Sequence, residues 1–399
     1  MQAVILAAGE GRRMRPLTSH LPKVMLPIAN VPILEHVLSQ ARDAGCEEIV
    51  LVVGYGEESV REHFKDGSAF GLSISYAPQR KQRGTADALL AASHLLEDPF
   101  LLLNGDALLR AEDLRAMLAA EPPVLATARS DHPWDYGAVE VEGGHVTSLR
   151  EKEAAPSTQL VNAGVYLLGA DIVPILSSLT PSPRGELELT DALLHYIRER
   201  GLAAFALSYW RDIGHPWDLL DANAEALAEL RSVREGVVEE GVVLKGRVSI
   251  GRESTIRSGT YIEGPCIIGN DCVVGPHAYI RGSTSIGDGC HVGHCTELKN
   301  TILMAGTKLP HFNYAGDSVI GRRCNLGAGT KIANLRHDRR EVLAGGKSTG
   351  KVKFGAIIGD DVKLGINCSV NAGSVLGSGT IAAPGAIIEG TYGEGSVVR

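Results

Sequence analysis

One stretch near the start decides the fold of the first half of the chain: Leu6-Ala7-Ala8-Gly9-Glu10-Gly11-Arg12-Arg13-Met14-Arg15-Pro16-Leu17-Thr18, followed by Pro22-Lys23-Val24-Met25-Leu26-Pro27-Ile28. It follows a short apolar run, Ala3 to Leu6, which predicts a buried first strand. Small residues let the backbone come close to a ligand, and backbone N–H groups in a glycine-rich turn bind anions. The arginines and the lysine add positive charge beside that turn. The order of these features predicts an anion-binding turn at the end of a strand.

The chain up to about residue 230 alternates short apolar runs with helical patterns. The strand candidates are Ala3–Leu6, Ile49–Val53, Ser73–Tyr76 and Pro99–Leu103, and the helix candidates are Ile33–Ala44, Glu57–Phe64, Ala86–Leu96 and Ala111–Ala119. Such alternation implies right-handed crossovers and ligands at the carboxyl ends of the strands. We expect a Rossmann-like α/β domain with a mixed, mainly parallel sheet, closed by a helix from roughly Pro216 to Arg231.

The second half of the chain repeats every six residues. Apolar side chains recur without a miss from Val238 to Leu298, at Ile320, Leu326 and Ile332, and again from Ile358 to Leu376. A small side chain stands two residues before many of them. A hexapeptide repeat predicts a β-helix, and three hexads per coil give a triangular prism with the aliphatic side chains inside. The repeat breaks after Leu298 and resumes at Ile320, and a polar excursion of about Arg336 to Lys353 precedes Ile358.

Length and charge set further limits. A chain of 399 residues is too long for one ordinary domain, so we expect domains at 1–231 and 232–399, joined near Ser232 to Glu240. The 39 basic and 47 acidic residues give a net charge of −8, which argues against nucleic acid as a partner. No apolar run reaches the roughly 18 residues that span a bilayer. Gly9 cuts the first apolar run short, which argues against a signal peptide, so we expect a cytoplasmic protein with no membrane partner.

The seven cysteines show no paired spacing and do not predict a disulfide framework. Five of them occupy the small-residue position of the repeat, which predicts that they fill space as Ser, Thr or Ala would. The pairs Cys290-His291 and His294-Cys295 invite a zinc interpretation. Zinc needs convergent ligands, whereas positions along a strand turn point in different directions, so the packing interpretation is favoured.

The opening stretch as a whole resembles the nucleotide-binding motif of the sugar-1-phosphate nucleotidylyltransferases. The resemblance implies that the glycine-rich turn binds the nucleotide, that Lys23 contacts the phosphate of the sugar substrate, and that Arg13 or Arg15 contacts the triphosphate. It also implies a base-recognition stretch at Gln79 and Gly84-Thr85-Ala86. The sugar-contacting segments it implies are Tyr136-Gly137, Glu151-Lys152 and Asn162-Ala163-Gly164. The nucleotide-binding residues expected on this basis are Ala7, Ala8, Gly9, Gly11, Gln79, Gly84 and Thr85, and those for the sugar phosphate are Gly137, Glu151, Lys152, Asn162 and Gly164.

Two carboxylates are candidates for a metal site. Asp106 ends the apolar strand Leu101-Leu102-Leu103-Asn104-Gly105-Asp106, where α/β folds hold a metal. The resemblance assigns Asp212, in Trp210-Arg211-Asp212-Ile213-Gly214-His215-Pro216-Trp217-Asp218, as the second Mg²⁺ ligand, and places Asp218 on a helix surface. A hard dication suits carboxylate oxygens and bridges phosphates. For an Asp at a strand end, a helix cap is the structural alternative.

The break in the repeat carries a second motif. Thr307-Lys308-Leu309-Pro310-His311-Phe312-Asn313-Tyr314-Ala315-Gly316-Asp317 resembles the catalytic segment of the bifunctional glucosamine-1-phosphate acetyltransferase and N-acetylglucosamine-1-phosphate uridylyltransferases, whose β-helix is left-handed. On this match His311 is the general base toward a sugar amine, with acetyl-CoA as co-substrate. The structural alternative is a histidine packed at a turn. The other matched positions are Arg281, Lys299 and Tyr314 for the sugar phosphate, and Glu297, Asn325 and Asn334 for the amino sugar and acetyl group. Leu335 stands where the family has Tyr, and this departure is more similar to the archaeal type.

Three functional hypotheses follow. The first is a bifunctional enzyme that acetylates glucosamine 1-phosphate and then transfers a nucleotidyl group from UTP or dTTP to N-acetylglucosamine 1-phosphate or glucose 1-phosphate. The second is a glucose-1-phosphate uridylyl- or thymidylyltransferase, or a mannose-1-phosphate guanylyltransferase, with an oligomerising, non-catalytic β-helix. The third is a non-catalytic assembly subunit, which Asp106, Asp212 and Lys23 together argue against. The family places the His311 segment at a subunit interface, so the resemblance also implies a homotrimer.

Overall fold

The computed structural model describes residues 1–399 and divides them into two compact units. Unit 1 consists of Met1–Glu10, Pro22–Met25 and Ile33–Asp212, and unit 2 of Gly11–Leu21, Leu26–Pro32 and Ile213–Arg399. The division cuts through the opening stretch. Two short segments of that stretch therefore make their contacts with the C-terminal half of the chain.

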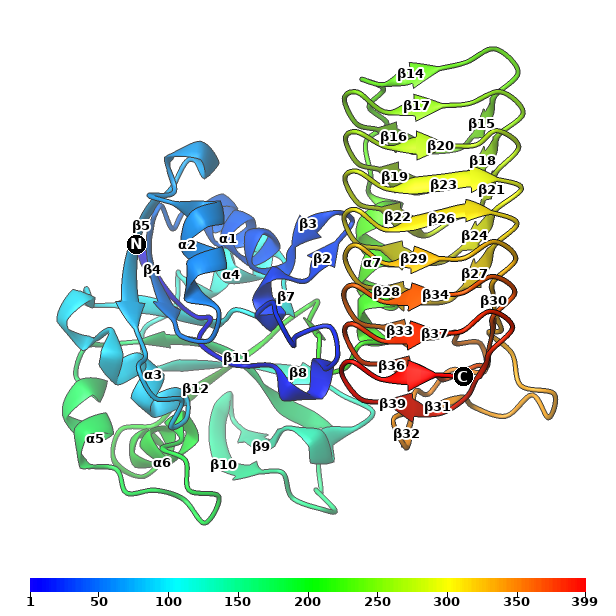
Figure 1. Ribbon diagram of the computed structural model, residues 1–399. Helices are drawn as coiled ribbons and strands as arrows, with labels where there is room; N and C mark the ends of the chain where they lie inside the picture. The colour runs from blue at the N-terminus through cyan, green and yellow to red at the C-terminus, as the bar shows by residue number, and fades with distance from the viewer. The chain divides into compact units, whose positions relative to one another are not determined.

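Unit 1 is built around a mixed nine-stranded sheet (Figure 1). Its strands run in parallel around β1 and antiparallel around β11, which confirms the mixed α/β sheet. The expected predominance of parallel pairs is not found, because four neighbouring pairs are parallel and four are antiparallel. The central strand β1 is buried along nearly its whole length, as expected of a strand covered on both faces. The strands in sheet order are β5 (Ser73–Pro78), β4 (Glu48–Val53), β1 (Gln2–Leu6), β6 (Phe100–Asn104), β11 (Leu160–Leu168), β8 (Val124–Arg129), β12 (Ala203–Ala206), β10 (His145–Glu151) and β9 (Gly137–Glu142).

The helices of unit 1 follow the predicted ranges. In α1 (Ile33–Ala44) the apolar side chains recur at helical spacing and are buried, and Gly45, with φ of 106°, ends the helix in a conformation that favours glycine. The helix expected over Ala86–Leu96 is shorter than predicted, because α3 (Thr85–Ala91) gives way to a 3₁₀ turn at Ser93–Leu95. The remaining helices are α2 (Glu57–Phe64), α4 (Ala111–Met117), α5 (Ile172–Ser178) and α6 (Leu189–Glu199).

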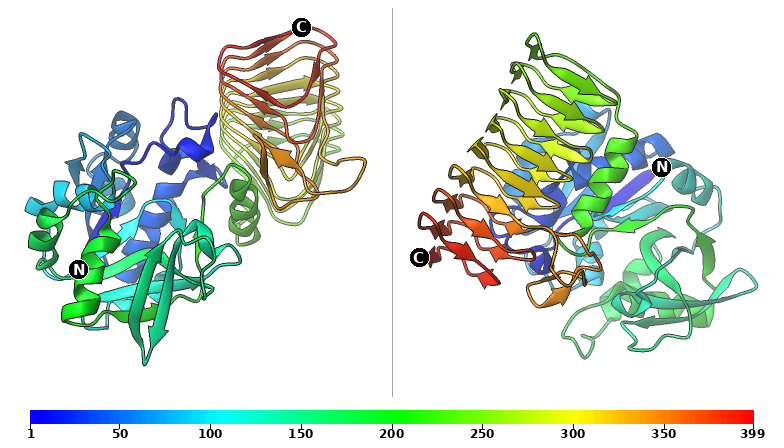
Figure 2. Two further views of the ribbon diagram at one scale, coloured as in Figure 1. Left: turned by 90° about the horizontal axis from the view of Figure 1, so that it is seen from below. Right: turned by 90° about the vertical axis from the view of Figure 1, so that its right-hand side faces the viewer.

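Most of unit 2 is a parallel β-helix, the left-handed hexapeptide fold that the sequence predicts, and the left view of Figure 2 looks along its triangular coils. The first sheet contains β14 (Val237–Val238), β17 (Thr255–Ile256), β20 (Val273–Val274), β23 (His291–His294), β26 (Lys308–His311), β29 (Asn325–Leu326), β34 (Lys363–Leu364), β37 (Ile381–Ala382) and β40 (Val397–Val398). The second contains β15 (Val243–Lys245), β18 (Tyr261–Glu263), β21 (Tyr279–Ile280), β24 (Glu297–Lys299), β27 (Tyr314–Gly316), β30 (Lys331–Ile332), β35 (Ser369–Val370) and β38 (Ile387–Ile388). The third contains β16 (Val248–Ile250), β19 (Cys266–Ile268), β22 (Thr284–Ile286), β25 (Ile302–Leu303), β28 (Val319–Ile320), β33 (Ile357–Ile358), β36 (Val375–Leu376) and β39 (Thr391–Tyr392).

The β-helix does not break where the six-residue count does. Leu303, Leu309 and Ala315 are fully buried and continue the row of core side chains through the apparent gap. Five residues instead of six separate Leu298 from Leu303 and Ala315 from Ile320, because two corners are one residue shorter. The six-residue spacing is interrupted after Leu298, as the sequence shows. The β-helix itself continues, so the expectation of a break in the structure is wrong.

The two ends of the predicted pattern also differ from expectation. Val238 does not lie inside the prism but is 38% exposed, because β14 is the first strand of its sheet and has a neighbour on one side alone. The helix expected near Pro216 to Arg231 is α7 (Asp218–Ala228), and it packs against β22. The polar excursion contains a short hairpin, β31 (Leu343–Ala344) with β32 (Lys347–Ser348).

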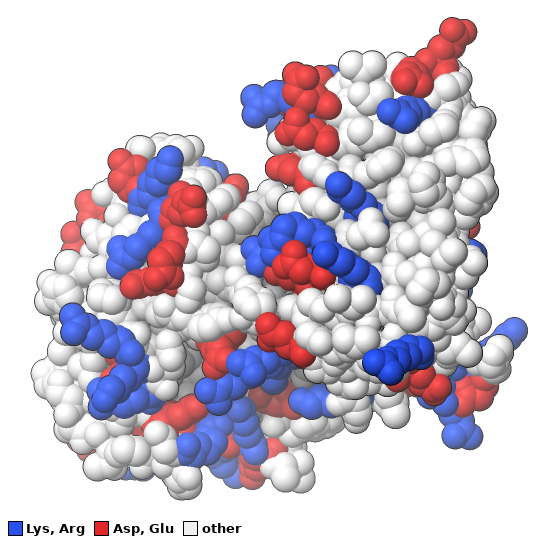
Figure 3. All heavy atoms as spheres, viewed as in Figure 1, with Lys and Arg blue, Asp and Glu red and all other residues white.

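The small residues of the repeat are buried as predicted. Cys266, Cys290 and Cys324 fill the interior, and burial raises the pKa of each thiol to about 12. All seven cysteines are unpaired, and Cys295 is exposed. On the face drawn in Figure 3, basic and acidic side chains lie interspersed over both parts of the chain. The chain has no helix with the length and apolar character needed to cross a membrane.

Candidate functional site

A short antiparallel ladder in unit 1 brings the two predicted metal ligands together. Strand β7 (Ala107–Leu108) pairs with β13 (Arg211–Asp212), and Asp212 lies opposite Ala107. Asp106 directly precedes β7, so the backbones of Asp106 and Asp212 lie at neighbouring positions at one end of this ladder. Tyr136 donates a hydrogen bond from its hydroxyl to Oδ2 of Asp212 at 3.2 Å.

Lys23 lies beside this carboxylate pair. Its Nζ is 2.6 Å from Oδ2 of Asp106, and the Lys23 side chain is 9% exposed against 32% for that of Asp106. A nearly buried ammonium requires a partner, and the carboxylate supplies it. The predicted phosphate contact, Lys23, is thus held at the carboxyl end of β6.

The donor set suits Mg²⁺. Asp106 and Asp212 offer hard carboxylate oxygens on one ladder, and Mg²⁺ is commonly bound by one or two carboxylates together with substrate phosphates and water. No group of three or more His, Cys, Asp or Glu side chains forms an all-protein cage in the structure. The site therefore fits a metal that completes its coordination with the substrate.

A pocket of about 160 Å³ lies in unit 1 and contains most of the predicted sugar-contacting residues. Tyr136 lines it and also bonds to Asp212, which connects the pocket to the carboxylate pair. The lining residues are Thr85, Asn104, Asp135, Tyr136, Gly137, Glu151, Asn162, Gly164, Tyr166, Leu189 and Thr190. The structure thus places Gly137, Glu151, Asn162 and Gly164 together and adds Thr85, which the sequence had assigned to the base.

Two glycines of the pocket are required by close contacts. Gly164 has φ of 72°, and a Cβ there would lie 2.1 Å from Nδ2 of Asn104, so neither the backbone nor the space admits a side chain. A Cβ on Gly137 would lie 3.0 Å from Oε1 of Glu151. Lys152, by contrast, is exposed and does not line the pocket.

Glu151 is the titratable group of interest in the pocket. Burial raises its pKa, although Arg184, 3.9 Å away, acts in the opposite direction. Its neighbour Glu188 behaves differently. Burial acts to raise the pKa of Glu188, but hydrogen bonds from Arg184 and Ser182 hold it below the ordinary value.

Of the predicted base-recognition residues, Gln79 lines a second depression together with Arg80 and Arg83, whereas Gly84 and Ala86 line neither pocket. The Gln79 side chain is buried and donates to the Gly84 carbonyl at 3.1 Å and to Asp87 at 2.9 Å. Gly84 has φ of 115°, and a Cβ there would lie 2.3 Å from the Leu187 carbonyl oxygen. The structure thus gives Gly84 a reason beyond the predicted approach of a base, namely the close packing of its own chain.

The glycine-rich turn itself follows β1. Ala7 and Ala8 are buried and bonded to the neighbouring β4 region, through Ala7 N to Val52 O at 2.8 Å and Tyr55 N to Ala8 O at 3.1 Å. Gly9 has open space around its Cα, which suits an approaching ligand. In unit 2, Gly11 adopts φ of 65° before the 3₁₀ turn Arg12–Met14, and Arg13 on this turn is exposed.

The second candidate site lies on the second sheet of the β-helix. Neighbouring strands place Glu297 beside Tyr314 and Lys299 beside Gly316. Arg281, which directly follows β21, lies 3.2 Å from Glu297 through Nη1 and Oε1. Burial raises the pKa of Tyr314. Four of the six matched acetyltransferase positions, Arg281, Glu297, Lys299 and Tyr314, thus form one patch.

Asp317 joins this patch to Asn334. Its side chain is 5% exposed and accepts from Lys299 Nζ at 2.9 and 3.0 Å, from Asn300 at 2.8 Å and from Asn334 at 2.5 Å. A Cβ on the preceding Gly316 would come within 2.6 Å of the Tyr314 hydroxyl. Because these three side chains donate to the same buried carboxylate, Asp317 fixes their orientation.

His311 ends β26 in the first sheet and is exposed. The side chain of Asn313, buried inside the coil, accepts from the His311 backbone N–H at 3.1 Å and donates to the Gly327 carbonyl at 2.8 Å. Phe312 between them has φ of 51°. Asn325 is exposed on the adjacent strand, opposite Lys308. A fixed turn therefore presents His311 at the corner between the first and second sheets.

Several residues of both sites were missed by sequence reasoning. Asn104, Asp135, Tyr166 and Thr190 line the pocket, and Asp317 organises the acetyltransferase patch. Asn104 and Asp317 stand next to or within quoted motifs, Gly105-Asp106 and the His311 segment, so their position was a usable signal. Asp218, expected on a helix surface, begins α7 and accepts from the His215 N–H at 2.6 Å.

Comparison with known proteins identifies the family. The nucleotidyl transferase family model matches residues 2–229, more than half of the chain. The chain is 36% identical to the bifunctional sugar-1-phosphate nucleotidylyltransferase/acetyltransferase of Sulfurisphaera tokodaii, and the match covers 100% of both chains. The chain belongs to this bifunctional family. It is an enzyme of the nucleotidyltransferase and acetyltransferase classes.

Further relatives agree. The chain is 46% identical to the bifunctional protein GlmU of Methanococcus maripaludis strain C7, over 100% of this chain and 97% of the relative. A crystal structure assigned as a glucose-1-phosphate thymidylyltransferase of Bacillus anthracis superimposes with a TM-score of 0.54 at 26% identity, and covers 59% of this chain and 98% of that one. A second family model, described as the GMPPB C-terminal domain, matches residues 262–384.

Proposed function

We propose that the chain is a bifunctional enzyme, with a nucleotidyltransferase domain at residues 1–231 and a left-handed β-helix acetyltransferase domain at residues 232–399. The first domain transfers a nucleotidyl group from UTP or dTTP to N-acetylglucosamine 1-phosphate or glucose 1-phosphate and releases pyrophosphate. The second transfers an acetyl group from acetyl-CoA to glucosamine 1-phosphate. The observation that carries the proposal is that one chain holds both the Tyr136-linked pocket and carboxylate pair and the Asp317-centred patch.

In the first reaction an oxygen of the sugar phosphate attacks the α-phosphorus of the nucleotide, and the bond to pyrophosphate breaks. The protein's task is to hold the reactants in line and to neutralise charge. Glu151 and Asn162 hold the sugar, while Lys23 and Arg13 neutralise phosphate oxygens. Asp106 and Asp212 would hold Mg²⁺, which supplies charge stabilisation on the phosphates.

In the second reaction the amine of glucosamine 1-phosphate attacks the thioester carbon of acetyl-CoA. His311 takes the proton that the amine loses as the C–N bond forms. The C–S bond then breaks, and the coenzyme A thiolate takes up that proton, which returns His311 to its neutral form. A histidine suits this task because its pKa lies near the working pH. Arg281 and Lys299 bind the sugar phosphate, Tyr314 lies beside them, and Glu297, Asn325 and Asn334 position the amino sugar and the acetyl group.

The test follows both reactions in one preparation. Glucosamine 1-phosphate and acetyl-CoA are supplied with UTP or dTTP, and acetyl transfer and pyrophosphate release are measured separately. A panel of sugar phosphates and nucleotides then identifies the preferred pair. Absence of acetyl transfer above the level of a His311→Ala variant would contradict the second activity and leave the first standing.

A second candidate function has its own support. The family model matched at residues 262–384 carries the description of a GMPPB C-terminal domain, and Leu335 stands where the acetyltransferase pattern has Tyr. In this alternative the β-helix is an oligomerising arm of a glucose- or mannose-1-phosphate nucleotidylyltransferase. It requires pyrophosphate release with GTP and mannose 1-phosphate, or with glucose 1-phosphate, in a protein that transfers no acetyl group.

We also propose a homotrimer. Exposed aliphatic side chains gather on the last coils of the β-helix, at Ile381, Ile387 and Val397, which are 49%, 70% and 67% exposed. Ile381 and Val397 are neighbours on the first sheet, Ile387 lies on the second sheet, and exposed apolar side chains favour self-association. Light scattering of the purified chain should give three times the chain mass, and a stable monomer would contradict the proposal.

A further inference from the structure

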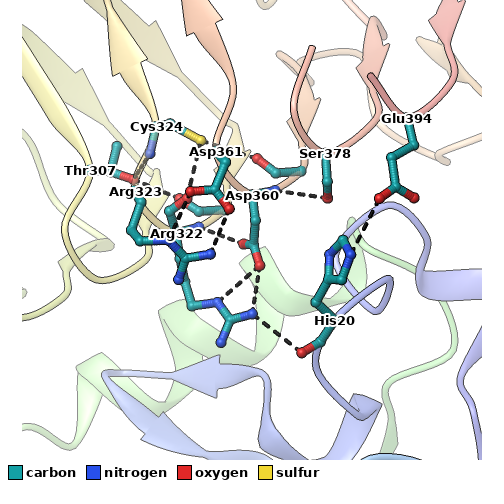
Figure 4. Close-up of polar contacts among 11 residues, drawn as sticks. His20, Thr307, Arg322, Arg323, Cys324, Asp360, Asp361, Ser378 and Glu394 are labelled. Atoms are coloured by element: carbon teal, nitrogen blue, oxygen red, sulfur yellow. Dashed lines mark hydrogen bonds and ion pairs between the residues drawn. The ribbon is translucent and has the colours of Figure 1, made fainter. Parts of the chain in front are cut away.

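A network of charged side chains on the β-helix contacts the opening stretch of the chain (Figure 4). At its centre is Asp360, whose side chain is 4% exposed. Asp360 accepts from the Arg322 guanidinium at 2.6 and 3.0 Å and from the Arg322 backbone N–H at 2.7 Å. Its own backbone N–H donates to Ser378 at 3.1 Å. Because Arg322 binds this carboxylate through its backbone N–H and through two guanidinium nitrogens, its side chain is held in one orientation.

The Arg322 guanidinium points at the end of the segment Gly11–Leu21. Its Nη2 donates to the His20 carbonyl oxygen at 3.4 Å, and the His20 ring lies 3.3 Å from the Glu394 carboxylate. Pro16 packs against the residue before Asp360, since a Cβ on Gly359 would lie 3.1 Å from that of Pro16. All these residues belong to unit 2.

The segment Leu26–Pro32 is also anchored on unit 2. Asn30 donates to the Ile286 carbonyl at 2.7 Å, and the Ala29 N–H donates to Asn223 at 2.8 Å. Asn223 is fully buried and bonded to Ser285 at 2.7 Å. Lys23, whose ammonium binds Asp106, therefore lies in a bridge of four residues between two segments that the β-helix holds.

We propose that Arg322, fixed by Asp360, is a positioning residue for nucleotidyl transfer. It holds the His20 carbonyl, and so keeps the segment that carries Gly11 and Arg13 in the conformation that receives the triphosphate. The proposal rests on the proposed nucleotide-binding role of this segment. It gives a coil of the β-helix a role in the conformation of the segment Gly11–Leu21, which belongs to the same unit.

The chain supplies a matched control one residue away. Arg323 forms the same kind of bidentate pair with Asp361, at 2.6 and 2.8 Å, but the two side chains are 55% and 50% exposed. The pair makes no hydrogen bond to the opening stretch, although Asp361 interacts electrostatically with His20, and Figure 4 shows the pair beside the Arg322–Asp360 pair. Substitutions at Arg322 and Arg323 thus remove equal charge from the same coil.

The experiment compares Arg322→Gln with Arg323→Gln in the full chain. Loss of a hydrogen bond made by a charged group predicts that R322Q raises the KM for the nucleoside triphosphate about tenfold with little change in kcat, whereas R323Q leaves both unchanged. Trypsin should also cleave R322Q faster after Arg12 or Arg13, and bound triphosphate should slow that cleavage. Acetyl transfer should stay at the wild-type rate in both variants.

Equal KM values and equal cleavage rates for R322Q and R323Q would overturn the proposal. If R322Q does not fold, Arg322→Lys replaces it, because lysine keeps the charge but cannot bind Asp360 and the His20 carbonyl together. Arg13→Ala separates the two levels of inference. An unchanged triphosphate KM in R13A would contradict the nucleotide-binding role itself, whereas a raised KM in R13A with none in R322Q would contradict the positioning role alone.

Discussion

The ammonium of Lys23 lies 2.6 Å from a carboxylate oxygen of Asp106, although 83 residues separate the two in the sequence. The pair places a cation and an anion at the carboxyl end of strand β6. A phosphate-transfer site needs both signs of charge there, one for the phosphates and one for a metal. The first prediction tests this pair.

Asp106→Asn should reduce pyrophosphate release by about 100-fold or more, since the substitution removes a charge aimed at the reacting phosphates. Acetyl transfer by the same preparation should be unchanged. The control is Asp43→Asn, because Asp43 is a half-exposed carboxylate paired with Arg42 at the surface. Wild-type pyrophosphate release in D106N would contradict the metal assignment and favour a non-catalytic first domain.

Glu151→Gln should stabilise the protein at neutral pH while weakening sugar binding. Burial raises the pKa of Glu151 in the folded state, so its contribution to stability is present below the ordinary carboxyl pKa and is lost as the pH rises through the raised value. Above that value the charged form is penalised, and glutamine removes the penalty. Thermal melting at pH 7 should give a higher Tm for E151Q, and the difference should vanish at low pH.

Glu188→Gln is the opposite case, at the residue directly before Leu189 and Thr190 of the pocket lining. Its hydrogen bonds hold the pKa of Glu188 below the ordinary value, so its contribution to stability is present at neutral pH and is lost as the pH falls through the lowered value. E188Q should therefore melt at a lower Tm than the wild type at pH 7. A Tm change of the same sign in E151Q and E188Q would show that burial does not control Glu151.

His311→Ala should lower acetyl transfer by roughly 10²- to 10⁴-fold, the usual contribution of a general base. Pyrophosphate release with N-acetylglucosamine 1-phosphate should stay at the wild-type rate. His337→Ala is the control, since His337 is an exposed histidine of the polar excursion in the same unit. Equal acetyl transfer in both variants would favour the oligomerising role of the β-helix.

Asp317→Asn should destabilise the β-helix by about 3 kcal/mol, because it breaks a buried ion pair and leaves Lys299 without its partner. It should also raise the KM for glucosamine 1-phosphate more than it lowers kcat, since Asp317 orients Lys299 and Asn334 without touching the reacting atoms. Asp338→Asn, at an exposed pair with Arg336, should have no measurable effect on melting or on KM. A kcat loss at unchanged KM in D317N would contradict the orienting role.

The sequence predicted both folds because each follows from a local rule. Strand–helix alternation and the six-residue repeat depend on which side chains are buried, and β1, α1 and the buried row from Ile250 to Leu298 follow that pattern. The carboxylates of Asp106 and Asp212 were also found in advance. The pairing of strands β7 and β13 beside them was not predicted, because both are two-residue strands that no local pattern distinguishes.

The remaining differences have a common physical origin in contacts between distant parts of the chain. The core continues through the His311 segment because two shortened corners keep the strands in register, which a fixed count of six does not anticipate. Asp317 orients three donors, Lys299, Asn300 and Asn334, which are distant from one another or from Asp317 in the sequence. Gly84 is explained by Leu187, about a hundred residues away.

The buried thiols of the β-helix make its folding visible by chemistry. Six of the seven cysteines are buried and Cys295 is exposed, so a thiol reagent added to the native chain should react rapidly at one position. Cys46 belongs to unit 1, whereas the five buried cysteines of the β-helix are distributed from Cys266 near one end of the stack to Cys368 near the other and become accessible as coils open. The order in which they react would report from which end the prism unwinds. The cysteines that fill space in the stack are therefore chemical probes of where along its axis the coils open.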